Sequence, residues 1–382
     1  MENSAIKLLK SLLEIPSVNS VDSEKNIAEY IAGYFDRHHI KASVQQIDDT
    51  HANVVAFVPG KNTEKTVVWN GHLDTVPYGS LEKWETNPSS AVEMDGRIYA
   101  RGASDMKSGL AAMIYALCHA DEKPACNIQF LGTCDEERNG LGAEAILEAG
   151  VMADADFILI GEPTGMNLGV AQKGCLWLEI QVKGKTSHGA YPKEGTNAIR
   201  HGIQIADGIK ACVERYSHVL LGNSTAQITM IEGGVVPNMT ADSCRIVMDI
   251  RMVPGLTAAM VIAHGEYLVR KEREIDNAVF ASFEVMNSRR AIEIEKGNYI
   301  TEGMRKLLKE KGYEGNDTGI SFFTDASLFD KAGHKDILLF GPGDPTLAHK
   351  ANEYVNIEKY EDAIQILQKF MTDCVSWEKV AY

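Results

Sequence analysis

The first forty residues have the apolar spacing of two amphipathic helices. Ile6, Leu9 and Leu13 recur at intervals of three or four residues, and Pro16 ends this pattern. Apolar residues again recur at helical spacing from about Ser23 to His39. The chain is therefore predicted to begin with two helices.

Beyond these helices, short apolar segments alternate with helical ones. The apolar segments are continuous, which is typical of strands that are buried on both faces of a parallel sheet. The predicted strands are Val54–Val58, Thr66–Asn70, Asn127–Gly132, Phe157–Ile160 and Ile337–Phe340. Helical segments such as Lys107–His119 and Ala143–Ala149 lie between them. This alternation predicts an α/β fold with a mostly parallel sheet.

A different order of elements is predicted between about Cys175 and Met286. Strand, helix, strand, strand, helix and strand follow one another there, which is the βαββαβ order of ferredoxin-like units. Afterwards helices are predicted at Tyr299–Lys311 and Ile357–Trp377. We therefore predict one α/β domain (1–174 and 288–382) that is interrupted by an inserted α+β domain (175–287).

Composition excludes several classes of protein. Hydrophobic residues make up 45% of the 382 residues, which is ample for a core. The net charge of −15 argues against a nucleic-acid or anionic-membrane partner. The longest mostly apolar segment, Gly109–Ala120, is shorter than the ~20 residues of a membrane helix, and the N-terminus lacks the pattern of a signal peptide. Seven scattered cysteines without a C-x-x-C pair add to the prediction of a cytoplasmic protein.

Histidines and carboxylates gather where the predicted strands end. Ligands collect beyond the carboxyl ends of parallel strands, so these side chains are expected to meet at one edge of the sheet. The candidate metal ligands are His72, Asp105, Glu137, Glu162 and His349. Imidazoles with carboxylates and no cysteine suit Zn²⁺, with Co²⁺ or Mn²⁺ as substitutes. One catalytic zinc needs only three protein ligands, so the larger set predicts two ions with a bridging carboxylate.

Two further acidic residues have candidate roles at this edge. Asp74 projects on the same side of its strand end as His72, and it could hold the other N–H of that imidazole. Glu136 and Glu137 are neighbours whose side chains diverge, so one could bind metal while the other acts as a base. Spacing alone does not decide which does which. Each of the segments that carry these residues, taken singly, is more typical of a solvated loop, a helix start or a turn. Five such segments at one edge of the sheet together favour a metal site.

With these motifs the chain resembles the M20 metallopeptidases, the group that contains acetylornithine deacetylase, succinyl-diaminopimelate desuccinylase, aminoacylase-1 and carboxypeptidase G2. The resemblance covers essentially the whole length. The matching segments are Gly71–Pro77, Arg101–Gly109, Asp135–Glu137, Gly161–Thr164, and Gly184–His188 with the following Pro192, Gly195, Asn197, Ala198 and Ile199.

The resemblance implies a role for each residue of the predicted centre. His72 and Glu162 would bind one zinc ion, Glu137 and His349 the other, and Asp105 would bridge them. Glu136 would be the general base, and Asp74 would orient His72. The larger domain would be a zinc-hydrolase catalytic domain.

The resemblance also implies that the inserted domain is a lid and the site of homodimerisation. His188 would reach the active site of the partner subunit and stabilise the oxyanion there. Asn238 and Arg251 match positions that contact substrate, and Thr324 is a further expected contact. Without the resemblance, His188 is typical of a solvated loop, Asn238 of a turn, and Arg251 of the outward face of a strand.

The expected reaction is metal-assisted hydrolysis of an amide. Glu136 would take a proton from the attacking water and deliver it to the departing amine. The segment Phe322–Ala326 departs from the glycine-rich pattern of desuccinylases, which favours an acetylornithine deacetylase-like enzyme acting on a small N-acyl amino acid. The alternatives are a succinyl-diaminopimelate desuccinylase or an M20 dipeptidase or carboxypeptidase that takes short peptides. A catalytically silent metal-binding protein is disfavoured because the ligands and the base are all present.

Overall fold

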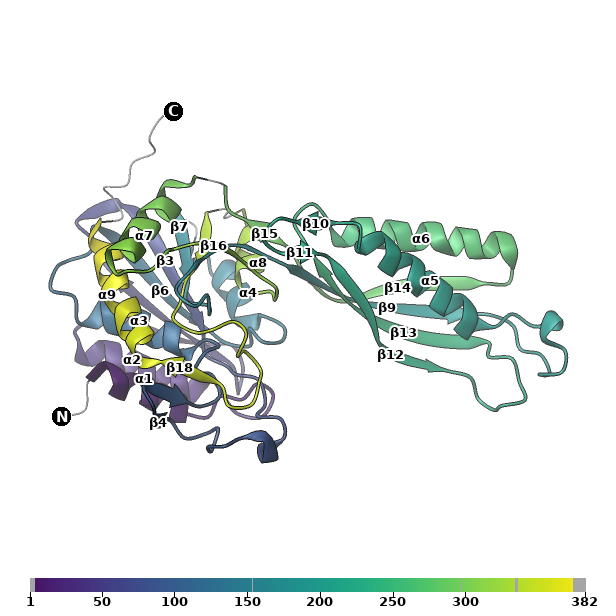
Figure 1. The fold of residues 1–382 in the computed structure, drawn as a ribbon, viewed down its shortest axis with the longest axis horizontal. Coiled ribbons are helices and arrows are strands. Elements are labelled where there is room, and N and C mark those ends of the chain that lie inside the picture. The colour runs from purple at the N-terminus through teal and green to yellow at the C-terminus, as the bar shows by residue number, and fades with distance from the viewer. Residues whose placement is uncertain (1–3, 153, 296, 334–335, 374–382) are drawn as a thin grey trace. The chain divides into compact units, whose positions relative to one another are not determined.

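The computed structural model describes residues 4–152, 154–295, 297–333 and 336–373, and these form two compact units (Figure 1). The first unit takes its residues from Met1–Val170, Ile294–Thr318 and Thr324–Tyr382. The second unit takes its residues from Ala171–Glu293 and Gly319–Phe323. The chain thus enters the second unit twice, the second time through a segment of only a few residues.

The first unit is built on a largely parallel sheet. From its β1 edge the sheet runs in the order β1, β2, β6, β3, β7, β17, β8, and the short strands β15 (Ile292–Glu293) and β16 (Asp317–Ile320) pair with β8. Strands β6, β3, β7 and β17 run parallel to one another, while β1 and β2 add an antiparallel edge. The strand bounds are Ala42–Gln46 (β1), Ala52–Val58 (β2), Asn62–His72 (β3), Cys126–Thr133 (β6), Phe157–Ile160 (β7), Leu168–Gln172 (β8) and Ile337–Leu339 (β17). The predicted α/β fold with a mostly parallel sheet is confirmed.

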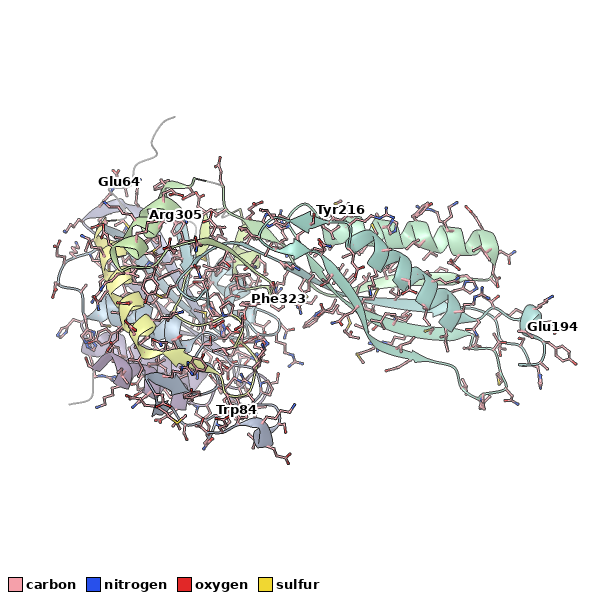
Figure 2. The ribbon with its side chains drawn as sticks, viewed as in Figure 1. Glu64, Trp84, Glu194, Tyr216, Arg305 and Phe323 are labelled. Atoms are coloured by element: carbon pink, nitrogen blue, oxygen red, sulfur yellow. The ribbon has the colours of Figure 1, made fainter. Side chains whose placement is uncertain are left out.

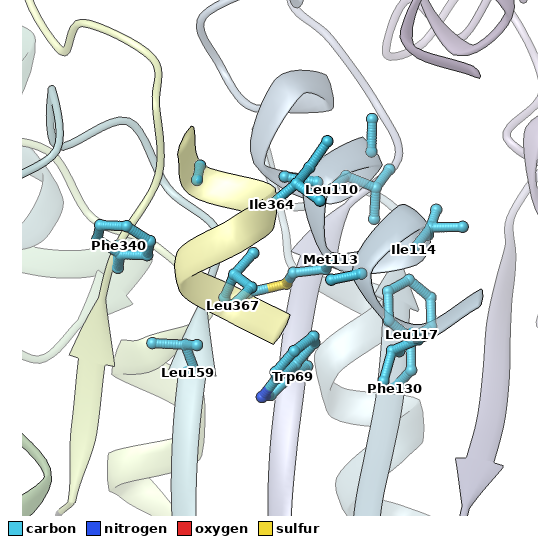
Figure 3. Close-up of a cluster of buried hydrophobic side chains, with 14 of the residues drawn as sticks. Trp69, Leu110, Met113, Ile114, Leu117, Phe130, Leu159, Phe340, Ile364 and Leu367 are labelled. Atoms are coloured by element: carbon cyan, nitrogen blue, oxygen red, sulfur yellow. The ribbon is translucent and has the colours of Figure 1, made fainter. Parts of the chain in front are cut away.

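Helices of the first unit pack around this sheet. Figure 3 shows α3 and α9 above the strands, where Met113 and Leu367 lie over Trp69. Trp69 is completely buried, and its large apolar ring removed from water contributes to the core beneath these helices. The helix bounds are Ser4–Glu14 (α1), Lys25–Arg37 (α2), Lys107–Cys118 (α3), Leu141–Glu148 (α4), Tyr299–Glu310 (α7), Ala326–Lys331 (α8) and Ile357–Asp373 (α9). The predicted continuation of the last helix to Trp377 lies outside the described residues.

A small antiparallel sheet in the first unit joins distant parts of the chain. Its strands β4 (Val92–Met94), β5 (Arg97–Tyr99) and β18 (Tyr354–Asn356) pair in the order β18, β5, β4. Because β5 precedes Asp105 and β18 follows His349, this pairing brings the two loops that carry those residues to one place.

A glycine lets α3 approach the central sheet closely. A Cβ atom on Gly109, in the first turn of α3, would lie only 1.8 Å from the carbonyl oxygen of Gly161. Such a contact with backbone is impossible without a shift of the chain. Gly109 therefore allows the start of α3, directly after Asp105, to lie against the loop that carries Glu162.

The second unit has an antiparallel sheet with two helices. The sheet order is β12, β13, β9, β14, and α5 and α6 pack against each other and against the sheet. The elements are β9 (Gly174–Lys183), α5 (Ala198–Val213), β12 (Thr225–Gly233), β13 (Ser243–Met252), α6 (Ala258–Ile275) and β14 (Phe280–Arg289). The short strands β10 (Ser217–His218) and β11 (Gly222–Asn223) form a separate hairpin. The larger elements follow the predicted βαββαβ order.

Two further sequence-based expectations can be compared with the described residues. None of the described helices is long and apolar enough to span a membrane. The cysteines in the described part of the chain form no disulfide with one another, and Cys374 lies outside it.

Candidate metal centre

The predicted metal ligands of the first unit lie at strand ends and in loops, most of them at the carboxyl ends of the parallel strands. His72 is the last residue of β3, and Glu162 follows β7 by two residues. Glu137 lies in the loop after β6, Asp105 lies just before α3, and His349 lies between β17 and β18. This edge of a parallel sheet is where such folds bind ligands.

Asp105 belongs to two groups of possible metal ligands. One group contains His72, Asp105 and Glu162, and the other contains Asp105, Glu137 and His349. Within each group the ligand atoms lie within 4.8 Å of one another. Oδ1 of Asp105 is 3.3 Å from Nε2 of His72, whereas Oδ2 is 3.4 Å from Nε2 of His349. Each oxygen of one carboxylate thus faces a different imidazole, which is the arrangement that a bridging carboxylate requires.

The two imidazoles differ in exposure. The side chain of His72 is 1% exposed, while that of His349 is 51% exposed. His349 has a positive φ of 64°, a backbone conformation that is uncommon for residues other than glycine and that is often found at functional sites. Its Nε2 lies 2.9 Å from Oε2 of Glu137. The centre is therefore accessible from the side of His349.

Buried oxygens without partners show that the site suits a cation. Oε1 of Glu136 and Oε2 of Glu162 are buried and have no hydrogen-bond partner among the described residues. A buried polar atom left unpaired costs about 1–3 kcal/mol, so these oxygens fit a site that is completed by a ligand. The nitrogen and oxygen donors fit a divalent metal such as zinc.

The electrostatics of the cluster lead to the same conclusion. Burial raises the pKa of Glu136 and that of Glu162 well above their ordinary values, and neighbouring carboxylates raise both further. Burial alone would lower the pKa of His349, but hydrogen bonds to Asp105 and Glu137 raise it to about 10. With every carboxylate ionised, the cluster would hold more negative charge than its imidazoles can offset, and bound cations would stabilise that ionised form.

Asp74 holds the loop of Glu136 and Glu137 through their main chain. Its Oδ1 accepts a hydrogen bond from the N–H of Glu136 at 3.1 Å, and its Oδ2 accepts one from the N–H of Glu137 at 3.2 Å. Nδ1 of His72 lies 2.9 Å from the carbonyl oxygen of Asp74 but 3.6 Å from its carboxylate. The closer partner of the imidazole is thus the main chain of Asp74. With Nδ1 donating to that carbonyl, Nε2 is left to face Asp105 and a metal.

Residues 68–373 match the sequence profile of peptidase family M20/M25/M40. The chain belongs to this family. It is a metal-dependent hydrolase, as the family and its relatives are.

Three similar proteins illustrate the range of this family. A probable succinyl-diaminopimelate desuccinylase of Staphylococcus aureus (strain MSSA476) is 26% identical, over 96% of this chain and 97% of the relative. An acetylornithine deacetylase of Buchnera aphidicola (subspecies Schizaphis graminum) is 28% identical, over 96% of this chain and 97% of the relative. The Bacillus subtilis YXEP protein, described as a dinuclear metal binding peptidase from the M20 family, has a similar fold, with a TM-score of 0.75, 16% identity and coverage of 98% of each chain.

Three of the predicted site residues of this M20 hydrolase lie in the second unit. The main chains near His188 and Asn238 lie side by side. The N–H of Gly189, the residue after His188, donates to the carbonyl oxygen of Asn238 at 2.8 Å. Arg251 lies on β13, and its Nε and Nη2 donate to the two oxygens of Asp249 at 2.7 and 3.0 Å. Its guanidinium is also 5.8 Å from the centroid of the Phe323 ring. The predicted roles of His188, Asn238 and Arg251 stay predictions.

Thr324 lies in the first unit and is buried. Its Oγ1 accepts a hydrogen bond from the N–H of Ala326 at 3.1 Å, and its carbonyl oxygen accepts one from Ser327 Oγ at 2.9 Å. These contacts hold the turn that leads into α8. The expected contact of Thr324 with substrate stays a prediction.

Other residues around the centre have no role in the sequence-based prediction. Nδ2 of Asn19 donates to Asp74 Oδ2 at 2.9 Å and to Asp135 Oδ1 at 3.1 Å. Asp325 is buried, accepts a hydrogen bond from Thr133 Oγ1 at 2.6 Å, and adds to the raised pKa of Glu136. Asn19 is found only once the chain has folded, whereas the Thr-Asp-Ala-Ser sequence at 324–327 already has the composition of a helix start.

Proposed function

We propose that the chain uses two zinc ions to hydrolyse the amide bond of a small N-acyl amino acid. The observation that carries this proposal is the position of Asp105, whose two oxygens face His72 and His349. The names of the relatives support the reaction class, since one is a desuccinylase and the other a deacetylase.

In this proposal each metal position is completed by the residues around Asp105. His72 and Glu162 would hold one ion, Glu137 and His349 would hold the other, and Asp105, which belongs to both candidate groups, would contribute to both positions. When bound, the ions polarise the substrate carbonyl and make water acidic enough to attack at neutral pH. The donor set also accepts Co²⁺ or Mn²⁺.

Glu136 moves the proton in the proposed reaction. Its carboxylate takes a proton from the attacking water as the new C–O bond forms. It then gives that proton to the amine nitrogen as the C–N bond breaks, so the products are a carboxylic acid and a free amine, which at neutral pH become a carboxylate and an ammonium group. The hydrogen bond from Glu136 N–H to Asp74 fixes the loop from which this carboxylate acts.

The substrate is proposed to be an Nα-acetyl amino acid such as Nα-acetylornithine. Arg251 is the proposed contact for a substrate carboxylate, through those N–H groups of its guanidinium that do not bond to Asp249. Asn238 and Thr324 are the other proposed contacts. Removal of a succinyl group is the second candidate, and the Staphylococcus aureus relative favours it equally.

A hydrolysis panel tests the reaction and separates these candidates. The zinc- or cobalt-loaded protein would be given Nα-acetylornithine, other N-acetyl amino acids, N-succinyl-diaminopimelate and simple dipeptides. We expect kcat/KM to be at least ~10-fold higher for one of the N-acyl amino acids than for any dipeptide, since the polar groups of a matched site reject a poorly matched substrate. Faster cleavage of dipeptides would replace the proposal with a peptidase, and fewer than one bound ion per chain would exclude the dinuclear centre.

We assign homodimerisation to the second unit, where His188 would serve the active site of the partner subunit. β12 is an edge strand of the sheet and exposes Ile228, Met230 and Ile231. An exposed apolar edge of this kind favours pairing with another chain. Sedimentation equilibrium should give twice the mass of one chain, and Ile231→Lys should lower it toward that of a monomer. A wild-type protein that stays monomeric at micromolar concentration would contradict the assignment.

A further inference from the structure

The carboxylate of Glu353 holds the main chain at Asp105. Glu353 is 0% exposed and lies directly before β18. Its Oε1 accepts hydrogen bonds from the N–H groups of Ser104 at 2.8 Å and Asp105 at 3.0 Å. Its Oε2 accepts one from Nη1 of Arg101 at 2.6 Å. One buried carboxylate is thus bonded both to the loop of the central ligand and to an arginine.

Arg101 connects this loop to two other loops of the centre. Its Nη1 also donates to the carbonyl oxygen of Lys350 at 3.1 Å, and Lys350 directly follows His349. Its Nη2 donates to the carbonyl oxygen of Pro77 at 3.3 Å, in the loop that follows Asp74. The guanidinium also lies 5.2 Å from the ring centroid of Trp84, which is labelled in Figure 2. All of these contacts lie within the first unit.

The loops joined in this way have little regular structure of their own. Residues 101–106 form turns, and residues 341–353 contain neither helix nor strand. A metal centre needs its ligands within about 0.5 Å of the productive geometry, which loops achieve only when other groups fix them. A buried ion pair is a weak source of stability because its desolvation offsets much of its attraction. The Arg101–Glu353 pair is therefore better explained by the positions in which it holds these loops than by the stability it adds to the fold.

We propose that Arg101 and Glu353 are positioning residues that fix the carboxylate of Asp105 between the two metal positions. This inference rests on the proposed dinuclear centre. Glu353 fixes the position of the Asp105 main chain by accepting its N–H. Arg101 connects Glu353 to the loops that follow His349 and Asp74. The pair acts on the metals through Asp105, and neither residue belongs to the ligand groups around it.

Conservative variants test the pair. In Glu353→Gln, one amide oxygen can still accept from the Asp105 loop, but the amide NH₂ then faces the donor Nη1 of Arg101. Arg101→Lys keeps the positive charge but loses the planar fork that reaches Glu353, Lys350 and Pro77 together. Arg101→Lys also serves as the informative variant if Glu353→Gln does not fold.

Arg305→Lys is the matched control. Arg305, which is labelled in Figure 2, is another arginine of the first unit. It connects parts of the chain through hydrogen bonds to Glu302, Asp317 and the carbonyl oxygen of Gly315. It takes no part in either ligand group. Its replacement should therefore show how much stability the first unit loses when a guanidinium that connects several segments is removed away from the ligand groups.

The experiment measures Co²⁺ binding by competition with a chelator, and the visible absorption spectrum of the cobalt-loaded protein. For Arg101→Lys and Glu353→Gln we expect metal affinity to fall ~10- to 100-fold, with an altered spectrum at saturating cobalt. Arg305→Lys should keep the affinity and spectrum of the wild type even if its melting temperature falls. Folded variants with the cobalt affinity and spectrum of the wild type would overturn this inference but not the proposed dinuclear centre. A wild-type protein that binds less than one ion per chain would overturn the proposed centre and the inference together.

Discussion

Replacing Glu136 by glutamine is expected to leave both metal positions filled and to lower kcat by at least ~10³-fold. General acid–base catalysis contributes about 10²–10⁴-fold, and Glu136 is proposed to act both as the base and as the acid. Glutamine has nearly the same shape, and the backbone N–H of residue 136 can still bond to Asp74. The loss should therefore appear in kcat, while KM and metal content change little.

Glu137→Gln is the comparison that separates a base from a ligand. Glu137 is next in the chain, but its carboxylate belongs to the group with Asp105 and His349. We expect this variant to bind less metal, as measured by mass spectrometry, and to lose activity that excess zinc partly restores. Excess zinc should not restore Glu136→Gln. Retention of more than a tenth of the wild-type kcat in Glu136→Gln would show that another group moves the proton.

The edge of the sheet that holds the centre was predictable from the sequence because the strands are continuous apolar runs. β6 and β7 are buried along their whole length, so the polar residues that directly follow them must lie at the carboxyl edge of the sheet. The spacing of His72 and Asp74 likewise predicted that both lie on one side. It could not show that the imidazole bonds to the carbonyl oxygen of Asp74, because sequence does not distinguish main-chain from side-chain acceptors.

The groups that hold the centre in place were not predictable in this way. Asn19 and Asp74 are 55 residues apart, and Glu353 and Asp105 are 248 residues apart. Asn19 and Glu353 are each a single polar residue in a loop, so no local periodicity marks them. Their pairing depends on tertiary contacts such as that between β5 and β18, which bring the Asp105 and Glu353 segments together.

Replacing Asp105 by asparagine is expected to have the largest effect on metal binding, because this carboxylate is common to both ligand groups. We expect the bound metal to fall from two ions to one or fewer per chain and kcat to fall to background. An amide has one oxygen instead of two and no charge, so it cannot face both His72 and His349 as an acceptor. Metal analysis after zinc reconstitution measures this loss directly.

Thermal stability gives an independent measure of the same loss. Zinc at 100 times its dissociation constant should stabilise the wild-type fold by about 2.7 kcal/mol for each site, so chelation should lower its melting temperature clearly. In Asp105→Asn that difference should shrink to half or less. Asp344→Asn is a matched control, since the Asp344 carboxylate accepts hydrogen bonds from Thr346 in its own loop and belongs to neither ligand group. If Asp105→Asn bound two ions and gained as much stability from zinc as Asp344→Asn, Asp105 would not be the bridge, and His72 and His349 would belong to separate sites.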